Sequence, residues 1–99
     1  MSQEDERQFY DLAQEHLSVA NEQLSDVSRG QVSASMMYAC ARFNAWVSAS
    51  RRESARDLQG AYGETIEYFV AQYRKMLVKN LDDFVANFGE YMEPPADRN

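Results

Sequence analysis

The chain has 99 residues, a formal net charge of -6 at pH 7, 44% hydrophobic residues and 12% aromatic residues. This length allows one small domain, and the aromatic content is sufficient for a compact core. The negative charge argues against binding to nucleic acid or to an anionic membrane surface, because both require a basic patch.

The first nine residues, MSQEDERQF, are acidic and polar, so no secretory signal is expected. The longest unbroken apolar run, residues 36–41, is far shorter than the roughly 20 residues that a membrane span needs. The single cysteine, Cys40, falls on an apolar stripe, which favours a packed thiol in a reducing compartment. The sequence therefore predicts a cytoplasmic protein that makes no contact with a membrane.

A first amphipathic helix is predicted over residues 3–27, where apolar side chains recur at steps of three and four. Ser2 and Asp5 resemble a capping box at its start. Gly30 suits a left-handed residue beyond its end. The short connection that follows requires the next helix to run antiparallel to the first.

A second helix is predicted over residues 31–52 and a third over residues 62–88, the third with one long apolar stripe. Together they predict a single all-α domain, residues 1–92, followed by a flexible polar tail, residues 93–99. Three amphipathic helices with short connections form a small up-down-up three-helix bundle.

The second predicted helix is apolar or small on two nearly opposite sides, at roughly 100° per residue. One side carries Val32, Met36, Ala39, Cys40, Phe43, Trp46 and Val47. The other carries Ala34, Met37, Tyr38, Ala41, Ala45 and Ser48. An ordinary surface helix has one apolar stripe, so this helix is expected to be covered twice.

The second apolar side of this helix predicts a homodimer that pairs through the side containing Ala41. That side covers only on the order of 200 Å², whereas a specific interface needs about 800 Å² from each partner. Other elements must contribute, and Val19, Tyr68 and Met76 lie off the main stripes. The alternative is an asymmetric bundle whose central helix lies deep between its neighbours.

Four polar residues fall at similar levels of the predicted bundle: His16, Arg42, Asn44 and Tyr73. One interpretation is a polar layer in mid-bundle that lines a site for a small apolar or anionic ligand. The other is a core histidine with a phenol or backbone partner, beside an arginine whose stem packs while its head reaches water.

One histidine and one cysteine exclude the usual zinc patterns, so neither a metal nor another cofactor is expected. Gly60 and Gly63 lack the Lys-Ser/Thr that completes a phosphate-binding loop. We therefore predict no catalytic residue and no enzymatic activity, with an enzyme of unknown type as a third and weaker hypothesis.

Three segments together resemble a known family: QFYDLA at residues 8–13, GQVSASMMYACARFNAW at residues 30–46 and EYFVAQYRKMLVKNLDDF at residues 67–84. In order and spacing they are similar to domain-of-unknown-function family 3144, a set of short bacterial proteins. The resemblance implies a compact cytosolic helical protein, and it supplies no activity, substrate or catalytic residue.

The function predicted first is protein–protein contact by a homodimer, as a scaffold, adaptor or regulator, with an unknown protein partner as a further option. The alternative is a helical bundle that binds a small ligand in mid-bundle. Neither hypothesis involves nucleic acid or a membrane.

Overall fold

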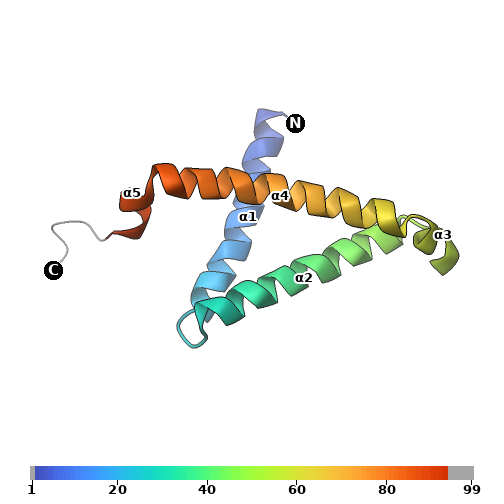
Figure 1. Ribbon diagram of the computed structural model, residues 1–99, viewed down its shortest axis with the longest axis horizontal. Helices are drawn as coiled ribbons and strands as arrows, with labels where there is room; N and C mark the ends of the chain where they lie inside the picture. The colour runs from blue at the N-terminus through green and yellow to red at the C-terminus, as the bar shows by residue number, and fades with distance from the viewer. Residues whose placement is uncertain (1, 94–99) are drawn as a thin grey trace. The chain divides into compact units, whose positions relative to one another are not determined.

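The computed structural model describes residues 2–93, and all regular structure in that range is helical (Figure 1). Three helices are long: α1 (Gln3–Gln23), α2 (Arg29–Ser50) and α4 (Tyr62–Ala86). Two short helices, α3 (Ala55–Gly60) and α5 (Phe88–Met92), were not predicted. The all-α class and the three long helices are confirmed.

The chain divides into two units, Met1–Arg51 with α1 and α2, and Arg52–Asn99 with α3, α4 and α5. The single domain predicted for residues 1–92 stays a prediction for the two units together. Of the predicted tail, Glu93 is extended, and residues 94–99 lie outside the described part of the chain.

Helix α1 begins where the capping box was predicted. The backbone N–H of Asp5 donates to Ser2 Oγ at 3.1 Å, and three acidic residues follow in the first turn. Carboxylates there face the positive end of the helix dipole, which stabilises the helix. The helix ends at Gln23, four residues before the predicted end.

The early end of α1 follows from the start of α2. Ser28 is extended, and its Oγ accepts a hydrogen bond from the backbone N–H of Gln31 at 3.2 Å. Because Ser28 caps the next helix, the chain must leave α1 before that residue. Gly30 therefore lies in the first turn of α2 and has no positive φ, so the predicted left-handed cap is wrong.

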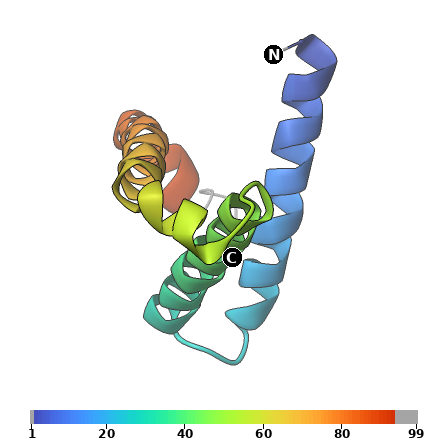
Figure 2. The ribbon, with the colours of Figure 1, turned by 90° about the vertical axis from the view of Figure 1, so that its right-hand side faces the viewer.

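Within the first unit, α1 and α2 pack together beside the turn that joins them (Figure 2). Ala20 on α1 and Val32 on α2 are buried, and Ala13, Val27 and Met36 are half-buried. Beyond the turn the two helices diverge (Figure 1), so most of each apolar stripe stays exposed within this unit.

The second unit begins with the short helix α3, whose N-terminus is capped by side chains. Ser54 Oγ accepts from the backbone N–H of Asp57 at 3.1 Å and starts α3. The carboxylate of Asp57 accepts from the backbone N–H of Glu53 at 3.1 Å and lies 3.5 Å from the Arg52 guanidinium. Ala61, between α3 and α4, is buried.

Helix α4 begins at Tyr62, as predicted, and ends at Ala86. Asn87 interrupts the third predicted helix: its side-chain nitrogen donates to the backbone oxygen of Asp83 at 3.1 Å and to Asp83 Oδ1 at 2.9 Å. An asparagine side chain that bonds to nearby groups competes with helix continuation. Gly89, the predicted cap, lies instead inside α5.

Candidate interaction surface on helix α2

Helix α2 is the least charged long helix, with Arg29 and Arg42 as its charged residues. Its 22 residues span about 33 Å at 1.5 Å per residue. We define two surfaces on it from the helical positions. The first α2 face comprises Val32, Met36, Ala39, Cys40, Phe43, Trp46 and Val47, and the second α2 face comprises Ala34, Met37, Tyr38, Ala41, Ala45 and Ser48.

The first α2 face turns toward α1 at its beginning and is uncovered farther along. Val32 is buried and Met36 is half-buried beside the turn. Phe43 and Trp46 are each 63% exposed, with their ring centroids 5.7 Å apart. Two large aromatic rings therefore lie exposed on one face of the first unit.

The second α2 face is exposed over almost its whole length. Tyr38 is 71% exposed and Met37 is 54% exposed, while Ser48 is half-buried. The remaining members are exposed alanines. The second α2 face thus combines two large side chains with four small ones and has no charged group.

The polar groups of α2 are largely satisfied within the helix. Ser48 Oγ donates to the backbone oxygen of Asn44 at 2.9 Å, and Ser35 Oγ donates to that of Val32 at 2.9 Å. The side-chain nitrogen of Asn44 lies 3.4 Å from Cys40 Sγ. Because these groups already have partners, covering the helix leaves few donors without one.

Cys40 is exposed, so the packed thiol predicted from the sequence is not observed within the first unit.

The predicted polar cluster is divided between the two units. His16 and Arg42 are exposed and Asn44 is half-buried in the first unit, while Tyr73 belongs to α4 of the second and is 49% exposed. The buried histidine suggested by the sequence is therefore not found within the first unit, and the ligand site that needs all four residues stays a prediction.

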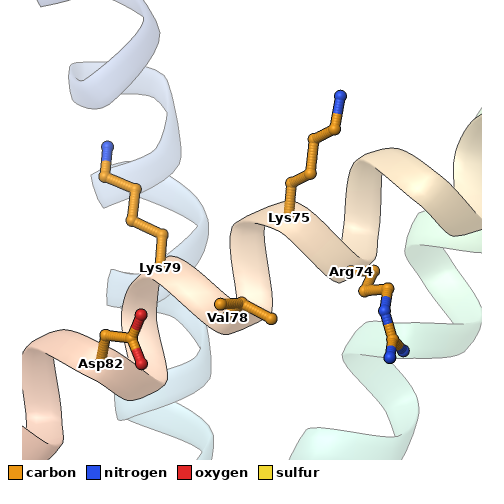
Figure 3. A pocket seen from close by; sticks show the side chains of 5 residues that line it. All are labelled: Arg74, Lys75, Val78, Lys79 and Asp82. Atoms are coloured by element: carbon orange, nitrogen blue, oxygen red, sulfur yellow. The ribbon is translucent and has the colours of Figure 1, made fainter.

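The residues Arg74, Lys75, Val78, Lys79 and Asp82 line a shallow, open hollow on α4. Figure 3 shows Lys75 and Lys79 extending to one side of the helix and Arg74 to the other. All five come from one helix and do not converge on a point, so this surface encloses no ligand.

Sequence reasoning missed a polar cluster where α4 meets α5. The Tyr91 hydroxyl donates to Asp83 Oδ2 at 3.0 Å, and the rings of Tyr91 and Phe84 are 4.8 Å apart. The hydrogen bond to the Asp83 carboxylate, together with its negative charge, raises the pKa of Tyr91. The spacing of Asp83, Asn87 and Tyr91 at four-residue steps was the signal for it.

Two further properties concern residues 2–93. No helix in that range is long and apolar enough to cross a membrane. No group of three or more His, Cys, Asp or Glu side chains in the same range is placed to hold a metal ion.

These features define an all-helical protein with an extensive exposed apolar surface. The chain belongs to the family described as "Protein of unknown function (DUF3144)", which matches residues 9–85 and confirms the resemblance noted in the sequence.

A solved structure is similar to the chain: the NMR structure of the protein NB7890A from Shewanella sp. The two sequences are 36% identical, with a TM-score of 0.72 over 84% of this chain and 88% of the Shewanella protein. No curated protein matches the chain.

Proposed function

We propose that this protein acts through protein–protein contact as a homodimer, in the role of a scaffold, adaptor or regulator in the bacterial cytoplasm. The observation that carries the proposal is the exposure of its apolar stripes. Among the described residues only Ala20, Val32 and Ala61 are buried, and all three are small or medium-sized.

Exposure of this kind is costly in water. Burying one large apolar side chain contributes about 1.5–3 kcal/mol relative to leaving it exposed. Phe9 and Leu17 on α1 and Phe84 on α4 are 44–48% exposed. Complete burial of each side chain would therefore still contribute a large part of that free energy. Burial of these apolar stripes against other helices is therefore strongly favourable.

Packing within one chain supplies part of that cover. We propose that α1, α2 and α4 form an up-down-up three-helix bundle, in which the stripes of α1 and α4 meet the first α2 face. The strongly one-sided stripes of α1 and α4 support this arrangement, because each helix then has a charged side left for water.

The accessible surface of the chain supports a second contact, between two copies of the chain. Its accessible surface is 9162 Å², whereas a compact monomer of 11.4 kDa exposes about 5,800 Å². The surplus is about 3,400 Å², of which packing between two units of one chain typically removes 600–1,500 Å². Allowing also about 1,100 Å² for the residues outside 2–93 leaves about 800–1,700 Å². One partner contributes about 800 Å² to a standard interface, so the remaining area is at least that large.

The test is the solution mass, measured by light scattering coupled to size exclusion over a range of protein concentrations. We expect about 23 kDa, twice the 11.4 kDa of one chain. A mass near 11 kDa at every concentration would contradict the homodimer.

A further inference from the structure

If the chain is the proposed homodimer, one surface of α2 is the best candidate for joining the two copies. In a three-helix bundle, the two neighbours of each helix lie on the same side of it. Helices α1 and α4 of one chain can thus cover one broad side of α2. The two α2 faces are centred nearly opposite each other, so one of them needs a helix from another molecule.

The short helices cannot supply that cover. Helix α3 has six residues and α5 has five, which give lengths of about 9 Å and 8 Å. The second α2 face extends from Ala34 to Ser48, about 21 Å along the axis. A helix of full length is required, and it must accept an uncharged surface.

A second copy of α2 meets that requirement in the antiparallel direction. When two antiparallel copies are related by a two-fold axis near Ala41, Ala34 of one lies opposite Ser48 of the other. Met37 then lies opposite Ala45, so a large side chain meets a small one on each side of the axis. A large side chain that faces a small one allows the two surfaces to interdigitate at the density of a protein interior.

The chemistry of these residues suits burial. The Ser48 hydroxyl already donates to the backbone oxygen of Asn44 at 2.9 Å, so it needs no partner across the interface. Arg42, the charged residue nearest the middle of α2, lies beyond Tyr38 around the helix and reaches the rim. Tyr38 has its ring available for packing and its hydroxyl for water.

We propose that two copies of this chain join by packing their α2 helices antiparallel through the second α2 face, with the two-fold axis at Ala41. The face covers about 200 Å² in each copy, a quarter of one partner's share of a standard interface. The rest of the area has to come from exposed apolar residues off the main stripes, such as Val19 of α1.

Disulfide cross-linking tests the pairing directly. In a Cys40→Ser background, Ala41→Cys places two thiols at the proposed axis. Helices about 8 Å apart bring facing Cα atoms to within about 4–6 Å, which a disulfide can span. We expect most of the protein to run as a covalent dimer after mild oxidation. Wild-type Cys40 lies about 100° away around the helix and is expected to give little covalent dimer.

A mixed pair tests the direction. In the same background, Ala34→Cys and Ser48→Cys chains are mixed, unfolded and refolded together. We expect a disulfide to form between the two different chains. Each alone should link little, because in the antiparallel pair its two copies are about 21 Å apart. Links between two Ala34→Cys chains would indicate parallel helices and overturn the proposal.

The outcomes separate this proposal from the homodimer itself. A protein that has twice the chain mass and gives no link at position 41 is a dimer joined elsewhere, which overturns the α2 pairing alone. A dimer that links through wild-type Cys40 would assign the interface to the first α2 face. A monomer at every concentration overturns both proposals.

Discussion

Helices α2 and α4 are similar in length, with 22 and 25 residues, yet they distribute apolar side chains differently. Helix α4 concentrates them on one stripe through Ile66, Tyr73 and Leu77, opposite a side with Lys75 and Asp82. Helix α2 has apolar or small residues on both sides. One neighbouring layer would cover the stripe of α4, whereas two layers would be needed to cover both α2 faces.

The contrast separates fold from assembly. A charged side such as that of α4 is stable in water and needs no further contact. The second α2 face has no charge of its own, and leaving Tyr38 and Met37 in water gives up the free energy of burying them. The helix with the weaker preference for one side is therefore the better candidate for the dimer interface.

The largest expected effect is that of Ala41→Glu. In the proposed dimer this change places two carboxylates face to face at the two-fold axis, without a counter-charge. We expect the dissociation constant to rise at least 100-fold, about 2.7 kcal/mol, which light scattering at several concentrations would detect. Helix content measured by circular dichroism should stay unchanged.

The matched control for that change is Ala71→Glu on the outer side of α4. Ala71 is exposed and lies one turn before Arg74 and Lys75, so a carboxylate there meets opposite charge. We expect the mass in solution to stay at twice that of the chain. If both variants dissociate equally, the effect of Ala41→Glu is not specific to the second α2 face.

A second pair of variants examines α4 itself. Leu77 is 43% exposed within its unit, and Val78, the next residue, is 51% exposed on the outer side. If the stripe is covered in the assembled protein, Leu77→Ala costs about 2–3 kcal/mol of unfolding free energy. Val78→Ala should stay within about 0.5 kcal/mol. Urea denaturation measures both, and equal losses would mean that the stripe stays uncovered.

The sequence predicted the regular parts of this fold well. The stripe of α4 repeats over seven turns, and the helix starts at Tyr62, where the stripe placed its approximate beginning. The ends of α1 and α4 were missed because single side chains decide them. Ser28 caps the following helix, and Asn87 bonds to Asp83 instead of allowing the helix to continue.

The candidate sites show the same division. The two α2 faces depend only on helical periodicity, and Tyr38 and Trp46 are exposed on them within the first unit; whether a partner covers these faces stays a prediction. The polar cluster of His16, Arg42 and Tyr73 required counting through two connections. The inserted helix α3 and the early end of α1 both change that count.

The cap of α2 gives a smaller effect that distinguishes the two helices. Ser28→Ala removes the hydrogen bond from the Gln31 N–H, and we expect a loss of about 1 kcal/mol in unfolding free energy. Helix α4 has no side-chain cap at its start, so it offers no equivalent position. The same substitution at Ser33, inside α2, is the control and should leave stability nearly unchanged.

The smallest expected effect lies at the end of α4, where the Tyr91 hydroxyl donates to Asp83. Because this bond raises the pKa of Tyr91, the folded state holds the phenolic proton more tightly than the unfolded state does. The resulting stabilisation is present below pH 10 and is lost as the pH rises through the raised value. Tyr91→Phe should remove this stabilisation, so the Tm of the variant should fall less between pH 9 and pH 11 than the Tm of the wild type.

Tyr62→Phe, at the other end of α4, is the control, and its Tm should fall with pH as the wild-type Tm does. If wild type and Tyr91→Phe have identical profiles of Tm against pH, the hydrogen bond does not form in solution.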